Sequence, residues 1–477
     1  MVPKMMNFGV KKRRGKRFFK PLKKKIMRNG KKVVLLQSET CENNMKRIIA
    51  ALLLLLPALA WGQTDFILLK GHVVCNKKGV PYATIQLKGT SKGVTCNDAG
   101  EYIMKVPVEN RNDTIMIRSV GYNTLETTVE KLSSIHKIEL TESMVVLKEV
   151  KVSDFKNARS MLSAAVARIS QNYHQEASKS TYFYRDWRAV EGELFLFDEA
   201  VMLLERVGYA HFDDKTTFRF STEERELESD YKTLLKHRLL VYDRKLVKEK
   251  TGLESGTNRM MEYADNEEFF DPVYTPHANY LLSKYMLKNI RFAPIKEFED
   301  NGETFYQLRF DIPIKSLRGE YIIRKKDLAI VKIVSAMPPK SRRPRAEEVW
   351  ANIFYNRLTV EADSSRWNYD VRDGHYTLTR YYNYKVYRLA AHNRNHDDKS
   401  ETWQLCTDWV LTDFSTHDST IYEGDTLSAM PMPIGTAFGG SYYNADYWGQ
   451  YNSVVIDTLP LRLLMEKLEK IHSNESQ

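Results

Sequence analysis

Cysteine is scarce in this sequence, and the common signatures of catalytic and metal sites are missing from it. With 4 cysteines among 477 residues, the chain is not a small fold held together by many disulfides. It contains no His-Glu-x-x-His, no paired Cys-x-x-Cys and no Gly-x-Ser-x-Gly, the spacings used by many zinc peptidases, zinc-binding modules and α/β-hydrolases. We therefore expect no catalytic residue, no metal ligand and no cofactor-binding residue, and we do not expect an enzyme.

Long apolar runs are missing as well. The longest, Ile48–Ala60, has 13 residues, whereas about 20 are needed to cross the hydrocarbon core of a membrane. Lys46 and Arg47 precede this run, and Ala60-Trp61-Gly62 ends it with small residues at the positions that a signal peptidase reads. We interpret residues 45–62 as a signal peptide cleaved after Gly62. The alternative is a membrane anchor with residues 1–44 as a cytoplasmic tail, which the short run and Pro57 near its end disfavour.

Positive charge is concentrated in the first 44 residues. They contain 14 Lys and Arg and 2 Glu, a charge of +12 against +11 for the whole chain, so the remainder carries about −1. Runs such as KKRRGKRFFK are typical of nucleic-acid or anionic-membrane binding. Because they precede a complete signal peptide, we interpret residues 1–44 as a basic, over-extended start with true initiation at Met45. We expect no nucleic-acid partner.

The exported chain, from about Gln63, is long enough for two or three domains. It keeps three cysteines, Cys75, Cys96 and Cys406. Oxidising conditions outside the cytoplasm would permit a Cys75–Cys96 disulfide and leave Cys406 odd. The spacing alone leaves open whether this pair is bridged.

Residues 66–142 alternate short β-rich runs with turns. NKKG, TSKG and NDAG separate pieces such as HVVC, YATIQL and EYIMKV, and the runs TIMIRSV, TLETTVE and HKIEL follow. Strand-length pieces divided by Gly- and Asn-bearing turns are typical of antiparallel sheets. Roughly seven strands in this length predict a two-sheet β-sandwich.

The order of turn residues in this segment resembles the carboxypeptidase regulatory-like domain, a transthyretin-like or immunoglobulin-like β-sandwich. The resemblance implies a module without catalytic activity of its own. We expect positive φ angles in the turns at Gly79 and Gly100, and Pro81 presets the chain before the next strand. The residues that carry the resemblance are Gly71, Gly79-Val80-Pro81, Ala83, Gly89-Thr90, Gly93, Thr95, Asp98, Gly100-Glu101-Tyr102 and Gly121-Tyr122.

Two stretches match the His-x-x-Glu pair with which zinc carboxypeptidases bind metal, but neither predicts a zinc site. His136 and Glu139 lie in the last strand of the sandwich, where residues three apart point to opposite faces. His472 and Glu475 lie in a polar tail close to the end of the chain. We expect no bound zinc.

Residues 154–472 predict an α+β domain with a large curved antiparallel sheet. Asp154 is a suitable N-cap for a helix that would cover one face of the sheet. Strands follow, joined by turns at Glu191-Gly192, Asp300-Asn301-Gly302, Lys326-Asp327 and Arg372-Asp373-Gly374. The charged interval TEERELESDYKTLLKHRLLVYDRKLVKEK favours helix, and a further helix is expected at the C-terminus. The buried positions of the first helix would be Ala158, Met161, Leu162, Ala165, Val166 and Ile169. The whole chain is thus expected to be mainly β with some helix.

This second part resembles, more weakly, uncharacterised envelope proteins that follow the same sandwich in Gram-negative secreted chains, and more distantly the curved half-barrel of lipoprotein carriers. Such a resemblance concerns architecture and location, not a reaction. It is carried by Tyr184-Arg185-Asp186, Phe197-Asp198-Glu199-Ala200, Phe305–Phe310, Gly319–Ile323, Asp446-Tyr447-Trp448 and Tyr451-Asn452.

Three functions follow from these observations. The favoured one is an exported binding or structural protein of the periplasm or outer membrane, with an envelope protein, a glycan or a lipid as partner and with peripheral membrane association. The second is a periplasmic carrier of an apolar ligand, which requires a continuous apolar concave face. Its only hint is the aromatic stretch Tyr376–Tyr387. The third is a hydrolase with an unrecognised site built from Glu267-Glu268, His392, His396 and Asp397-Asp398, which a solvated loop explains more simply. The sequence predicts no oligomeric state.

Overall fold

The computed structural model describes residues 66–143, 148–149, 157–176, 178–206, 208–209, 230–240, 271–274, 280–283, 287–338, 357–390, 400–416, 425–427 and 452–455. All of them belong to one compact unit, Thr64–Gln477. The basic leader, the signal-peptide candidate and the C-terminal helix lie outside the described residues. Within these ranges, no helix has the length and apolar character needed to span a membrane.

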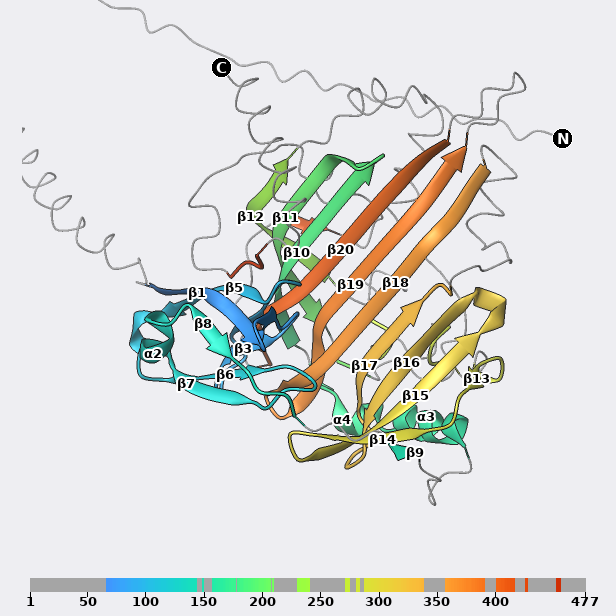
Figure 1. Ribbon diagram of the computed structural model, residues 1–477, viewed down its shortest axis with the longest axis horizontal. Coiled ribbons are helices and arrows are strands. Elements are labelled where there is room, and N and C mark those ends of the chain that lie inside the picture. The colour runs from blue at the N-terminus through green and yellow to red at the C-terminus, as the bar shows by residue number, and fades with distance from the viewer. Residues whose placement is uncertain are drawn as a thin grey trace, which may run out of the picture. The chain divides into compact units, whose positions relative to one another are not determined.

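The N-terminal part is a β-sandwich of two four-stranded sheets (Figure 1). In the first sheet, β1 (Phe66–Cys75) pairs with β2 (Lys78–Gly79), β5 (Glu101–Pro107) and, in parallel, β8 (Lys137–Glu139). The second has the order β4 (Gly93–Thr95), β3 (Thr84–Leu87), β6 (Thr114–Arg118), β7 (Leu125–Thr128). The predicted sandwich is confirmed, with eight strands rather than seven.

At two positions of the sandwich, neighbouring backbone lies so close that only glycine fits. A Cβ at Gly100, whose φ is +81°, would lie 2.3 Å from the carbonyl oxygen of Val73. A Cβ at Gly79 would lie 1.9 Å from the carbonyl oxygen of Ala99, yet the φ of Gly79 is not positive. The prediction was therefore right for Gly100 and wrong for Gly79, where lack of space rather than left-handed backbone excludes a side chain.

One predicted strand of the sandwich ends earlier than expected. The sequence predicts a single strand for TLETTVE, but β7 ends at Thr128 and is followed directly by α2 (Val129–Ser133). The Thr128 hydroxyl accepts a hydrogen bond from the amide of Lys131, at 3.3 Å, and so caps the helix. Val129 and Leu132 are buried in the sandwich core, so packing rather than β-propensity decides this segment.

The rest of the described chain forms one 13-stranded sheet (Figure 1). Its order is β21-β12-β11-β10-β20-β19-β18-β17-β16-β15-β14-β9, and β13 also pairs with β15. Apart from the short strands β9, β13 and β21, the sheet consists of longer antiparallel neighbours, as the sequence predicts. The strands are β9 (Lys148–Glu149), β10 (Ser178–Val190), β11 (Glu193–Arg206), β12 (Asp230–Leu240), β13 (Arg291–Phe292), β14 (Lys296–Asp300), β15 (Glu303–Ile312), β16 (Leu317–Arg324), β17 (Ile330–Ala336), β18 (Arg357–Arg372), β19 (His375–Ala390), β20 (Ser400–Ser415) and β21 (Asp425–Leu427). Two short 3-10 helices, η1 (Val108–Asn110) and η2 (Pro313–Lys315), follow β5 and β15.

The four predicted turns of this sheet are present, and the backbone angles of three of them are those of two-residue hairpins. Positive φ angles occur at Glu191-Gly192, at Asn301-Gly302 and at Asp373-Gly374. Each pair connects two antiparallel neighbours, as the primed turns of two-residue hairpins do. At the fourth, Lys326-Asp327, the positive φ falls on Leu328. The helical reading of the charged interval before residue 250 is wrong for residues 230–240, which form β12. Hydrogen bonding to β11 and β21 on its two sides overrides the helical pattern.

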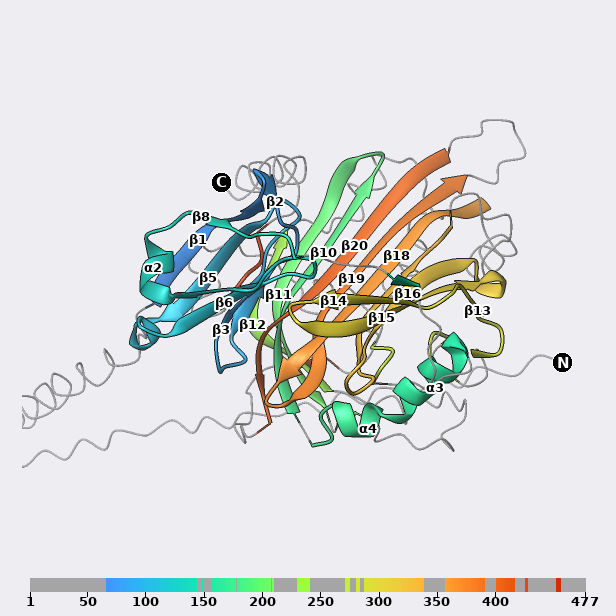
Figure 2. The same ribbon diagram turned by 60° about the horizontal axis from the view of Figure 1, so that its bottom comes forward.

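The predicted first helix is present as α3 (Ala158–Ala167) and α4 (Ile169–Asn172) (Figure 2). Its N-cap is Asn157 rather than Asp154. The Asn157 side chain accepts from the amide of Ser160 at 3.0 Å, and the Ser160 hydroxyl accepts from the amide of Asn157 at 3.2 Å. Because the capping box lies at this position, the helix begins three residues later than expected.

The apolar face of this helix packs on the large sheet as predicted. Ala158, Met161, Leu162, Ala165 and Ile169 are buried in a core that includes strands β10 and β15 to β20. Val166 is only partly buried at its margin. This face of the sheet is called the helix-side face below.

Candidate functional site

The helix-side face of the sheet carries a row of aromatic residues. Across neighbouring strands, Tyr184, Trp409, Tyr381 and Trp367 stand opposite one another in register. All four are buried, with ring centroids 4.9 Å apart for Tyr184 and Trp409 and 5.5 Å apart for Trp367 and Tyr381. These residues are part of the core beneath α3.

Two residues further along each strand, the same face becomes polar. This polar row consists of Asp186, Thr407, Asn383, Ser365 and Ser335, one from each of five neighbouring strands. All five are buried. The Asn383 amide donates to the Ser365 hydroxyl at 2.8 Å, and Asp186 accepts from the guanidinium of Arg188 at 2.8 Å. Register alone brings these residues together, since they are far apart in sequence.

The polar row bears on the carrier hypothesis, which requires a continuous apolar face. Along the described strands, that continuity ends at the polar row. The aromatic stretch Tyr376–Tyr387 also divides between the two faces, because residues alternate along β19. Tyr376 and Tyr381 belong to the core, whereas Tyr384 lies on the opposite face, with its ring centroid 6.2 Å from that of Trp187.

Lys385 follows the polar row on the same face. It stands opposite Leu405 in β20 and Asp363 in β18. Burial disfavours the ammonium and lowers the pKa of Lys385 to about 8. A shifted pKa can mark a functional site or a structural polar cluster, and here it accompanies the buried pair Asp186 and Arg188.

The opposite face of the sheet meets the sandwich, and the surface of contact is called the junction below. Tyr82 of the sandwich lies under two guanidinium groups of the sheet. The Cζ atoms of Arg380 and Arg366 lie 4.2 Å and 5.4 Å from its ring centroid. Arg380 is held in place by Asp408, with Nε to Oδ1 at 3.0 Å and Nη2 to Oδ2 at 2.7 Å.

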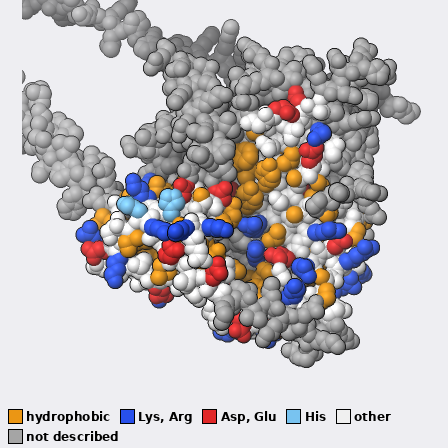
Figure 3. Space-filling model, viewed as in Figure 1, with side chains coloured by type: hydrophobic (Ala, Val, Ile, Leu, Met, Phe, Trp, Pro, Cys, Tyr) orange, Lys and Arg blue, Asp and Glu red, His pale blue; other side chains and the backbone are white. Residues whose placement is uncertain are grey.

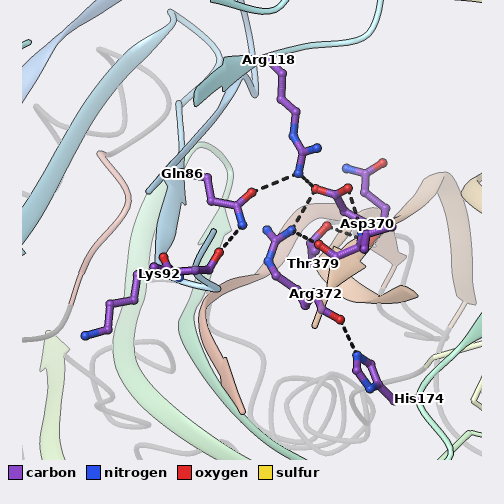
Figure 4. Close-up of polar contacts among 10 residues, drawn as sticks. Gln86, Lys92, Arg118, His174, Asp370, Arg372 and Thr379 are labelled. Carbon is purple, nitrogen blue, oxygen red and sulfur yellow. Dashed lines mark hydrogen bonds and ion pairs between the residues drawn. The ribbon is translucent and has the colours of Figure 1, made fainter. Parts of the chain in front are cut away.

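A second contact of the junction centres on one carboxylate (Figure 4). Arg118 extends from the sandwich and Arg372 from the sheet, and both donate to Oδ2 of Asp370. Arg118 also donates to Oε1 of Gln86, at 3.1 Å. Burial lowers the pKa of both guanidinium groups to about 10. Behind them, Nε2 of His174 donates to the carbonyl of Arg372 at 2.6 Å.

A third contact uses the predicted turn between β14 and β15. Ser143 donates from its hydroxyl to Oδ1 of Asp300 at 2.8 Å. Asn301 accepts from the amide of Thr124 at 2.8 Å and donates to the carbonyl of Tyr122 at 2.9 Å. Besides reversing the chain, this turn therefore binds the sandwich.

A fourth contact involves the segment 452–455. The Asn452 side chain accepts from the amide of Lys105 in the sandwich, at 2.7 Å. Val454 packs against Phe183 and Val410 of the sheet. The guanidinium of Arg185 donates to the carbonyls of residues 454 and 455 and forms a buried ion pair with Glu199 at 2.7 Å. The structure thus pairs Arg185 with Glu199, two residues of the weaker resemblance, and places a third, Asn452, against the sandwich.

Figure 3 shows the surface of the described residues on one side of the molecule. A row of Lys and Arg crosses the middle of the sandwich, with Asp and Glu above and below it, and apolar side chains gather over β10 and β20.

The candidate zinc residues are engaged in other contacts. Nδ1 of His136 lies 3.3 Å from the carbonyl oxygen of Lys70, and Glu139 pairs with Lys137 at 3.0 Å. In the ranges given above, no group of three or more His, Cys, Asp or Glu is arranged to hold a metal ion. Cys75, Cys96 and Cys406 are buried free thiols. The other candidates, Glu267-Glu268, His392, His396, Asp397-Asp398, His472 and Glu475, lie outside the described residues.

Sequence reasoning missed most of the junction. Tyr82, Arg118 and Asp370 belong to no motif, and Arg372 was expected only as part of a turn. The one available signal was Tyr82, a large residue in the turn after Pro81, where Gly or Asn is usual.

The comparisons with known proteins agree with the sandwich. The sequence model of the CarboxypepD_reg-like domain family matches residues 69–152. Among curated proteins none matches the chain. One solved structure, titled "Lipid-protein interactions in lipovitellin", aligns with 55% of this chain and 28% of its own length at 8% identity and a TM-score of 0.21. A likeness that low carries no argument about fold or ligand.

Proposed function

We propose that this carboxypeptidase regulatory-like domain-containing protein is an exported, non-catalytic binding or structural protein of the cell envelope. In this proposal, the sandwich is the interaction module and the large sheet is the platform that carries it. Location in the periplasm or at the outer membrane is supported by the signal-peptide pattern of residues 45–62.

The observation that carries the proposal is the distribution of exposed apolar side chains. Of the seven large apolar residues exposed in the described ranges, five lie in the sandwich, although it is the smaller part. Interaction sites are built from exposed apolar surface, so the concentration of such side chains on the smaller part supports the sandwich as the interaction module. The five are Leu68, Val108, Val120, Leu125 and Ile135.

The buried charges support a structural rather than a catalytic role. Arg185 pairs with Glu199, Arg188 with Asp186, and Arg380 with Asp408. Each pair is hydrogen-bonded between neighbouring positions of the sheet, the arrangement that buried charges need for their own stability.

The proposal is tested by purifying the mature protein from its native envelope and identifying what accompanies it in stoichiometric amount. Val120→Glu, at a residue 68% exposed, should reduce the accompanying protein, glycan or lipid without changing the melting temperature. Ile314→Glu is the matched control, because Ile314 is 64% exposed but lies outside the sandwich. Equal retention in both variants would contradict the sandwich as the interaction module.

Export is tested separately by mass spectrometry of the same protein. The N-terminus should be at or near Gln63. Peptides from residues 4–32 in the mature protein would refute the assignment of leader and signal.

A further inference from the structure

The backbone of Tyr82 is in the left-handed region. Its φ is +60°, which a large L-residue adopts at a cost of about 5- to 30-fold in conformer population. Its amide donates to the carbonyl of Asn97 at 3.3 Å. This hydrogen bond uses only backbone atoms, so the turn does not require a tyrosine side chain. A glycine would satisfy this turn without strain.

Contacts at the junction explain why a tyrosine occupies this position. Its ring faces Arg380 at 4.2 Å and Arg366 at 5.4 Å, both from the sheet. Arg380 and Asp408 are buried, and their double hydrogen bond orients the guanidinium toward the ring. A cation over an aromatic face becomes more favourable as the pair loses contact with water, and here Arg380 is buried and Tyr82 partly buried.

We propose that Tyr82 anchors the sandwich on the large sheet, and that its left-handed turn is maintained because the ring contacts Arg380 and Arg366 across the junction. Strained backbone conformations persist where surrounding contacts determine them, and they concentrate at sites with a role. The unfavourable backbone conformation of Tyr82 is thus offset by ring contacts that fix the sandwich on the sheet. This inference does not depend on the proposed function.

Tyr82→Gly should separate the two effects in the full mature chain. It relieves the left-handed strain, so amides of β1 and β5 inside the sandwich should exchange with deuterium as slowly as in the wild type, or more slowly. It also removes the ring, so amides at the junction, in Gly93–Thr95 and Leu405–Leu411, should exchange about 5- to 30-fold faster.

Two further variants act as controls. Tyr82→Phe keeps the ring and should leave junction exchange unchanged. Lys77→Gly relieves a similar left-handed residue, with a φ of 67°, in the exposed turn between β1 and β2, and it should slow exchange in the sandwich without affecting the junction.

Three results would overturn the proposal. Unchanged junction exchange in Tyr82→Gly would show that the ring is not an anchor. The same acceleration in Tyr82→Phe would assign the effect to the hydroxyl. Faster exchange throughout β1 and β5 in Tyr82→Gly would show that Tyr82 stabilises the sandwich internally.

Discussion

Leu162 offers a direct test of how the chain divides. Its side chain is completely buried at the centre of the α3 face that covers the sheet. Leu162→Asp replaces this apolar contact with a carboxylate that has no positively charged partner among the core residues around it. We expect the large-sheet part to unfold and the sandwich to survive.

The magnitude follows from two contributions. Truncating a buried leucine costs about 2–5 kcal/mol through lost contacts and a residual cavity. Burying an unpaired carboxylate, or neutralising it, adds several kcal/mol. The sum is on the order of 5–10 kcal/mol, comparable with the typical domain stability of about 5–15 kcal/mol.

Tryptophan supplies an assay that distinguishes the two parts. Residues 66–142 contain none, whereas Trp187, Trp367, Trp403 and Trp409 lie in the sheet. Fluorescence during urea denaturation therefore reports the sheet, and deuterium exchange in β1 and β5 reports the sandwich.

Ser163→Asp is the matched control, because Ser163 is the adjacent residue of the same helix and is exposed. It should leave both signals unchanged. Two results would refute the reasoning: a Leu162→Asp protein with unaltered fluorescence, or one cooperative loss of sheet and sandwich together. The second would mean that residues 66–142 and 154–472 are not separate folding units.

Three further predictions concern protons and metal. Because the pKa of Lys385 is about 8 in the folded chain against 10.5 ordinarily, the unfolded chain binds more protons between these values, and stability should rise there by on the order of 1–3 kcal/mol. In urea denaturation, Lys385→Met should abolish this rise of stability with pH. An unchanged pH profile in the variant would show that Lys385 is not its source. Burial lowers the pKa of His174 below its ordinary 6.5, so stability should fall as the pH drops through 6.5, when the unfolded chain takes up the proton. His174→Gln, which keeps a donor for the carbonyl of Arg372, should weaken that acid sensitivity, whereas equal sensitivity would exclude His174 as its source. Elemental analysis should find no stoichiometric zinc, and one zinc per chain lost in His136→Ala would reverse the interpretation of that residue.

The sequence by itself determined the elements whose causes are local. Alternating apolar residues and Asn- or Asp-Gly turns predicted the sandwich and the hairpins, because side chains alternate across a strand and positive φ suits few residue types. The spacing of Met161, Leu162, Ala165 and Ile169 predicted the buried face of α3 for the same kind of reason. The order of glycines in residues 66–142 likewise indicated the regulatory-like domain.

Only the tertiary structure decided the features that depend on distant neighbours. Residues 230–240 are a strand because β11 and β21 supply hydrogen bonds on both sides. The polar row exists because register places Asp186, Asn383 and Ser365 on one face of neighbouring or next-neighbouring strands. Arg118 and Asp370, which meet at the junction, are 252 residues apart. No local pattern encodes such pairings, since their energy comes from contacts that form only when the sandwich and the sheet are both folded.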